Sequence, residues 1–196
     1  MQRYIPAILL GLFLVLPGVL SAQPVGQPYT HQQTGLQFPG KLGGFVLTKT
    51  DTYEQKALGT SLRYEDADRA KVNVFIYDMG IPDLPDDINA EVVKQHVQQM
   101  TADIYTLEKR GEYVGVKELL DGTVQIGKLK GWFKVFEYSQ KGDPGASGGP
   151  TRKSYAVLTV SQKNFIKVRV TCWASDGMRA DRKLREFLDA LGGVFK

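Results

Sequence analysis

Residues 164–173 read NFIKVRVTCW, and their side chains alternate in character with a period of two. Aliphatic residues and the single cysteine occupy one set of positions, namely Ile166, Val168, Val170 and Cys172. Aromatic, basic and polar residues occupy the other set, namely Phe165, Lys167, Arg169, Thr171 and Trp173. This alternation predicts a β-strand with one apolar face and one mixed face. Because both faces carry bulky side chains, each face of the sheet needs a cover or a ligand.

The same period recurs along the chain. Residues 71–78 (KVNVFIYD) place Val72, Val74 and Ile76 on one face. Further strands are expected at 44–50, 60–65, 115–120, 123–128, 132–139 and 154–161. The dipeptide Asp121-Gly122 predicts a two-residue hairpin, and Gln162 to Asn164 predict another. Connections this short imply antiparallel pairing.

Two segments change to helical spacing. Between Asn89 and Arg110 the apolar residues fall on one stripe at about 100° per residue, and Gly111 ends it. A second stripe lies between Gly177 and Leu191. The order of strands, helix, strands and helix predicts an α+β domain, with a mostly antiparallel sheet of about six to eight strands and two main helices. If each helix covers one face, the domain is an α/β/α sandwich; if both share one face, an aromatic and basic face stays open.

The N-terminus has the layout of a secretory signal peptide. Residues 1–22 (MQRYIPAILLGLFLVLPGVLSA) contain a basic residue, a short apolar core, a Pro-Gly break and a small pair at the end. We expect cleavage, a periplasmic or secreted protein and no membrane span afterwards; an uncleaved N-terminal anchor is the alternative. Residues 23–34 predict a flexible leader in which His31 is exposed to solvent, and residues 35–196 a single α+β domain.

Composition excludes several classes of function. Removing 22 of the 196 residues leaves 174 and lowers the net charge from +4 to +3, which gives no case for binding nucleic acid. One cysteine and two histidines exclude a disulfide framework, a cysteine-based zinc site and a three-histidine metal site, so no metal and no cofactor is expected. The motifs G-x-S-x-G, H-E-x-x-H, C-x-x-C and G-x-G-x-x-G are absent from the sequence.

These observations predict an exported, non-enzymatic binding or accessory module for a protein or small-molecule ligand. The residues expected to bind are Phe165, Lys167, Arg169 and Trp173, which share the mixed strand face, together with Trp132. No catalytic residue is assigned. A small secreted enzyme that uses Asp/Glu chemistry, or Cys172 with His96, is the alternative. We expect Cys172 and His96 to pack in the core, because each lies within an apolar row.

Two predicted loops carry residues of the kind found in binding sites. Asp78, Asp83, Asp86 and Asp87 gather carboxylates of the kind that calcium binds, but the EF-hand spacing is absent, and the start of a helix explains the last two. Residues 142–150 predict a mobile surface loop able to touch a partner, and they lack the phosphate-loop motif.

The N-terminal part of the domain carries a family resemblance. Gly35-Leu36-Gln37-Phe38-Pro39 is followed by Gly43-Gly44-Phe45, a β-meander, a long helix, more strands and a terminal amphipathic helix. This order resembles the small α/β/α sandwiches of the PsbP and Mog1 type and secreted bacterial proteins of this size. The resemblance implies a binding or assembly role with both sheet faces covered. It offers no functional residue that can be carried over to a position in this chain.

Overall fold

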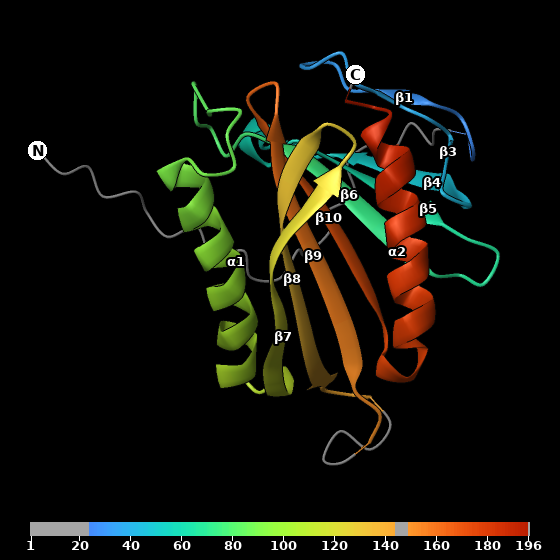
Figure 1. The fold of residues 1–196 in the computed structure, drawn as a ribbon, viewed down its shortest axis with the longest axis vertical. Helices are drawn as coiled ribbons and strands as arrows, with labels where there is room; N and C mark the ends of the chain where they lie inside the picture. The colour runs from blue at the N-terminus through green and yellow to red at the C-terminus, as the bar shows by residue number, and fades with distance from the viewer. Residues whose placement is uncertain (1–23, 144–148, 196) are drawn as a thin grey trace, which may run out of the picture.

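The computed structural model describes residues 24–143 and 149–195. Within them, eight strands form one antiparallel sheet in the order β3-β4-β5-β6-β10-β9-β8-β7 (Figure 1). The strands are β3 (Lys41–Leu42), β4 (Phe45–Thr52), β5 (Thr60–Glu65), β6 (Lys71–Tyr77), β7 (Tyr113–Ile126), β8 (Leu129–Gln140), β9 (Arg152–Ser161) and β10 (Asn164–Trp173). β1 (Tyr29–Thr30) and β2 (Gln37–Phe38) pair separately. Two single turns of 3-10 helix, η1 (Lys56–Leu58) and η2 (Ala174–Asp176), complete these elements. The α+β class is confirmed.

The two helices, α1 (Glu91–Lys109) and α2 (Gly177–Gly192), lie on opposite faces of the sheet (Figure 1). Apolar residues of α1 belong to the same buried cluster as Phe165, whereas those of α2 share a cluster with Ile166. Consecutive residues of a strand point to opposite faces, so each helix covers its own face. The α/β/α arrangement is therefore the one found, and the alternative with both helices on one face is excluded.

α1 covers only part of its face of the sheet. The clusters under α1 draw on β7, β8, β9, β10 and the end of β6, and among the described residues they include none of β4 or β5. The half of that face formed by β4, β5 and most of β6 therefore lies outside the α1 clusters.

One predicted hairpin is wrong. Asp121-Gly122 lies inside a single long strand, β7, and the chain turns instead at residues 127–128, where Ile126 pairs with Leu129. Asp121 stays in the strand opposite Lys134, whose ammonium lies 2.9 Å from its carboxylate, so the ion pair favours continuation of the strand. The second predicted hairpin is confirmed: Ser161 pairs with Asn164 across a two-residue turn.

The expected leader contains ordered structure. Tyr29 pairs with Phe38, and the expectation that His31 is exposed is wrong, because only 3% of its surface reaches solvent. Its Nδ1 lies 2.9 Å from the hydroxyl of Thr34. The neighbouring Leu36 and Phe38 belong to the core under α2, and the burial of their side chains keeps this segment packed against the domain. The proposed signal peptide, residues 1–22, and positions 144–148 of the expected loop lie outside the described residues, and the domain boundaries stay predictions.

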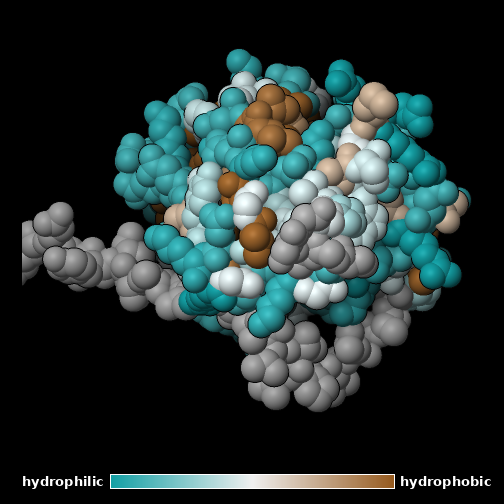
Figure 2. All heavy atoms as spheres, turned by 90° about the horizontal axis from the view of Figure 1, so that it is seen from below, coloured by the Kyte–Doolittle hydropathy of each residue, from teal (hydrophilic) through white to brown (hydrophobic). Residues whose placement is uncertain are grey.

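The sheet edge formed by β7 exposes apolar side chains. Val114, Leu119 and Leu120 are 49%, 43% and 55% exposed. The register of β7 against β8 shifts twice, between Val114 and Lys117 and between Glu118 and Leu120. Such irregularities weaken an edge as a template for a further strand. Seen from below, the described surface shows apolar side chains in small patches separated by polar ones (Figure 2).

Candidate functional site

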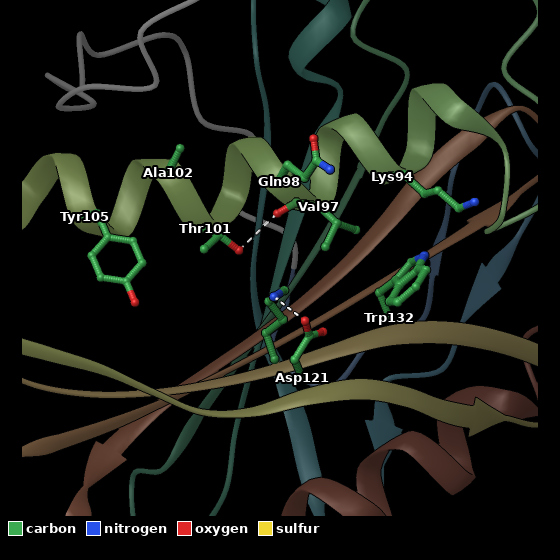
Figure 3. A pocket seen from close by; sticks show the side chains of 9 residues that line it. Lys94, Val97, Gln98, Thr101, Ala102, Tyr105, Asp121 and Trp132 are labelled. Carbon is green, nitrogen blue, oxygen red and sulfur yellow. Dashed lines mark hydrogen bonds and ion pairs between the residues drawn. The ribbon is translucent and has the colours of Figure 1, made fainter.

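A groove of about 480 Å³ lies between α1 and strands β7 and β8 (Figure 3). One flank of α1 contributes Lys94, Thr101 and Tyr105 to its lining, and the sheet contributes Trp132 and Asp121. Trp132 and Tyr105 lie towards opposite ends, with Asp121 between them (Figure 3). Short side chains on the middle of the helix leave the space between the two aromatic rings.

Contacts within the protein fix the orientation of the Trp132 side chain. It lies on β8 opposite Leu158, and its indole N–H donates a hydrogen bond of 2.8 Å to the carbonyl oxygen of Ile88. The only donor of the indole is therefore satisfied inside the protein. What remains for a ligand is the apolar ring, in a fixed orientation. A rigid aromatic ring in a groove is a common anchor of binding interfaces.

A charged group forms the floor of the groove. The ammonium of Lys134 lies 2.8 Å from Glu118 and 2.9 Å from Asp121, and 10% of the lysine side chain is exposed. Desolvation by itself would lower the pKa of Lys134, but hydrogen bonds to the two carboxylates outweigh it and raise that pKa above its ordinary value. The lysine is therefore a fixed, neutralised cation, and it does not serve as a free base.

The structure separates the residues expected to bind. Phe165 is fully buried under α1, with its ring centroid 4.5 Å from that of His96, so it is not part of the accessible surface. Lys167 and Arg169 are half-buried on the same sheet face. Trp173 lines a different hollow of about 400 Å³ beside the start of α2, where the guanidinium of Arg152 lies 4.6 Å from the ring centroid. Trp132 thus stands in one groove and Trp173 in another.

Cys172 and His96 do not form a catalytic pair. His96 belongs to α1 and projects towards the sheet, where the hydroxyl of Tyr77 and Nε2 of His96 share a hydrogen bond of 2.6 Å. Cys172 packs against the cluster on the α2 side, and its thiol donates a hydrogen bond of 3.7 Å to the carbonyl of Lys153. Burial lowers the pKa of His96 to about 4 and raises that of Cys172 to about 11. The sheet separates the two side chains, which excludes the thiol version of the enzyme hypothesis.

Carboxylates of the acidic loop before α1 accept hydrogen bonds from backbone N–H groups and so stabilise turns. Asp78 accepts the N–H of Gly80 at 2.8 Å, and Asp87 accepts the N–H of Asn89 at 2.9 Å. Asp86 does not cap α1 as its position predicted, because its two carboxylate oxygens accept the N–H groups of Gln162 and Lys163, each at 2.9 Å. It fixes the turn between β9 and β10 from a distance of 76 residues in sequence.

Within residues 24–143 and 149–195 no group of three or more His, Cys, Asp or Glu side chains is arranged to hold a metal ion. The helices in these ranges include none that is long and apolar enough to cross a membrane.

Sequence reasoning missed the helix side of the groove. Lys94, Gln98, Thr101 and Tyr105 follow a spacing of four, three and four residues, so they form one row along α1 beside the buried stripe. A row of small, polar and aromatic residues next to an apolar stripe indicates that this flank of the helix is only partly covered by the sheet. By itself it does not show which strand the flank faces.

Comparison with known proteins gives a likeness of fold. No protein-family model matches the chain, and no curated protein matches it. The solution structure of cyanobacterial PsbP (CyanoP) from Synechocystis sp. PCC 6803 is similar, with 11% sequence identity and a TM-score of 0.49, over 93% of this chain and 96% of that chain. The Ran-binding protein Mog1p of Saccharomyces cerevisiae is also similar, with 13% identity and a TM-score of 0.39, over 82% of this chain and 92% of that chain. The expected PsbP and Mog1 resemblance is confirmed, and it concerns the fold alone.

Proposed function

We propose that this chain is an exported, non-enzymatic binding or accessory module, and that the groove between α1 and β8 receives an apolar or aromatic side chain of a partner protein. The observation that carries the proposal is the fixed Trp132 ring, whose N–H is satisfied inside the protein while the ring lines an open groove. Export rests on the sequence of residues 1–22.

The groove suits a side chain presented by a protein. Its aromatic ends supply apolar contact, and Lys94 and Asp121 add charges of opposite sign to its lining. An opening flanked by both charges accommodates a polypeptide backbone, whose N–H and C=O groups interact with anions and cations respectively. The separation of Cys172 from His96 and the structural use of the acidic loop favour binding over catalysis.

Filling the groove tests the proposal. Peptides are selected from a displayed random library on the mature protein, and their affinities are then measured against two variants. Thr101 lines the groove and points towards the sheet (Figure 3), so Thr101→Trp fills the groove from the helix side. Gln95 is exposed on the same helix outside the groove, so Gln95→Trp is the matched control.

Selected peptides are expected to share an aromatic or large aliphatic residue and to lose at least about tenfold in affinity with Thr101→Trp, while Gln95→Trp changes affinity less than about twofold. Equal binding to both variants contradicts the groove as the site. Selective binding of small aromatic molecules, with no peptide enriched, contradicts the protein partner.

Export is tested separately. The full chain is produced in a bacterial host, and the extracytoplasmic protein is sequenced from its N-terminus. A mature start at residue 22 or 23 supports export with cleavage. A chain retained at the membrane with residue 1 intact supports the uncleaved anchor instead.

A further inference from the structure

On the α1 side of the sheet, a row of cations runs from β4 and β5, which lie outside the α1 clusters, to β10, which also carries Phe165 of those clusters. Lys49 of β4 pairs with Arg63 of β5, Arg63 pairs with Asn73 of β6, and Asn73 pairs with Arg169 of β10. Lys167 lies two residues before Arg169 on the same face. Strands lie about 4.8 Å apart and residues rise about 3.4 Å along a strand, so the backbones of Arg63 and Arg169 are about 10 Å apart and those of Lys167 and Arg169 about 7 Å.

Within the described part of the chain, the inner cations of this row form no ion pair with a carboxylate. Lys49 pairs with Asp51 at 2.8 Å. Arg63 instead donates from Nε to the amide oxygen of Asn73 at 3.2 Å, and Arg169 donates to the hydroxyl of Tyr113 at 3.5 Å. Among the ion pairs of the described residues, none involves Arg63, Lys167 or Arg169. These three side chains, all half-buried, are called the cationic row below.

The charge of Lys167 is disfavoured in the absence of an anion. At Arg169, by contrast, desolvation is outweighed by the hydroxyl groups of Tyr138 and Tyr113, which raise the pKa of the guanidinium. Burial first, and the guanidinium of Arg169 second, lower the pKa of Lys167 to about 8. Asp103 of α1 acts in the opposite direction but does not restore the ordinary value. A half-buried ammonium that is repelled by a neighbouring cation is stabilised by any anion that binds next to it.

We propose that the cationic row binds an extended acidic segment of a partner protein, at a surface separate from the α1 groove. Alternate side chains of an extended chain are about 6.8 Å apart, which matches the separation of Lys167 and Arg169 along β10. The two guanidinium groups present forked donors that fit carboxylates. Half-buried Phe75, paired with Lys167 across the strands, adds an apolar contact within the same surface.

The depth of the charges favours a polypeptide over other anions. The three residues are half-buried, and desolvation is strong at the charged ends of Lys167 and Arg169, so a carboxylate on a narrow, flexible side chain suits them better than a flat layer of lipid headgroups. They also extend over about 10 Å, which is longer than one phosphate ion spans. The net charge of +3 that we expect for the mature chain adds weak long-range attraction for an acidic partner.

The test uses the mature protein at low salt and a fluorescent peptide of four Glu-Ser repeats. Fluorescence anisotropy measures its affinity, with the Gln-Ser peptide as the uncharged control. Arg63→Gln combined with Lys167→Gln removes two charges from the row. Arg182→Gln combined with Arg185→Gln removes two exposed charges from α2 and is the matched control.

The row variant is expected to lose at least about tenfold in affinity for the Glu-Ser peptide, and the α2 variant less than about twofold. A second readout needs no substitution: in the wild-type protein, the pKa of the Lys167 ammonium, followed by NMR of its side-chain nitrogen, is expected to rise when the peptide binds. Equal losses in both variants, or an unchanged Lys167 pKa at saturation, overturn the proposal.

Two further probes separate the anion classes. Inorganic phosphate alone, or vesicles with 30% anionic phospholipid, are added in place of the peptide. Weak binding of both, with no dependence on Arg63 and Lys167, supports the acidic segment. Binding of either probe that matches the peptide in affinity and in this dependence overturns it in favour of a small anion or a membrane surface. None of these results bears on Trp132, so this proposal and the groove proposal succeed or fail independently.

Discussion

His96 makes the stability of this domain depend on pH. The imidazole projects from α1 towards the sheet, with the ring centroids of Phe165 and Tyr77 4.5 Å and 5.6 Å away, and its Nδ1 is buried without a hydrogen-bond partner among the described residues. Burial first, and the charge of Lys167 second, lower the pKa of His96 to about 4. The folded protein therefore keeps this side chain neutral where an unfolded chain would protonate it.

The sign and size follow from proton binding. Between the unfolded pKa of 6.5 and the folded value of about 4, the unfolded state binds the extra proton, so stability falls as pH falls through this window. One pKa unit corresponds to about 1.4 kcal/mol, so the loss reaches about 2 kcal/mol at pH 5 and about 3 kcal/mol near pH 4. Burial also lowers the pKa of His31, which adds a loss of the same sign.

Urea unfolding followed by tryptophan fluorescence at pH 7, 6 and 5 measures this dependence. His96→Gln keeps an acceptor for the hydroxyl of Tyr77 but cannot titrate, so most of the slope between pH 7 and 5 is expected to disappear. His31→Gln is the matched control and removes only the smaller part. If His96→Gln unfolds with the same pH slope as the wild-type protein, the assignment of a buried, neutral His96 is refuted.

Three further outcomes are expected. Gly59→Ala lowers the free energy of unfolding by more than about 2 kcal/mol, because φ is +62° and a Cβ would lie 1.9 Å from a carbonyl oxygen of β6. Gly122→Ala is the tolerated control, because open space surrounds that position. An equal loss of unfolding free energy in both variants contradicts the reasoning. Asp86→Ala speeds amide hydrogen exchange at residues 162 and 163, because it removes the acceptor of both N–H groups. Asp83→Ala removes an exposed ion pair to the same turn and leaves this exchange rate unchanged. Unchanged exchange with Asp86→Ala would refute the role of Asp86 in holding the turn. Since burial raises the pKa of Cys172 to about 11, its thiol is expected to react with iodoacetamide at pH 8 at least about tenfold more slowly than glutathione, and a rate equal to that of glutathione refutes its burial.

Local patterns predicted most elements of the fold. The helix expected from Asn89 to Arg110 is found from Glu91 to Lys109, and the one expected from Gly177 to Leu191 ends one residue later. The hairpin predicted at Asp121-Gly122 does not form, because a turn-forming dipeptide competes with pairing across strands. Here the ion pair of Asp121 with Lys134 favours the strand. The predicted solvent exposure of His31 is wrong for a similar reason, since its neighbours pack onto a core that is distant in sequence.

The site was predicted less well than the fold. Trp132 was expected to bind a ligand or partner, which stays a prediction; the structure places it in the lining of a groove whose residues on α1 the sequence did not indicate. Phe165, Lys167 and Arg169 do share a sheet face, as their alternation requires, yet the first is buried under α1 and the other two are only partly accessible. The period of a strand shows which residues share a face and is silent on how far a helix covers that face.

The sequence by itself determined the α+β class, both main helices, and the two faces of the central strand, because these follow from spacing between near neighbours in the chain. Only the tertiary structure decided that α1 and α2 take opposite faces, that α1 stops short of β4 and β5, and that Cys172 and His96 are separated by the sheet. Those features depend on contacts between residues far apart in sequence, where packing of whole elements outweighs local preference.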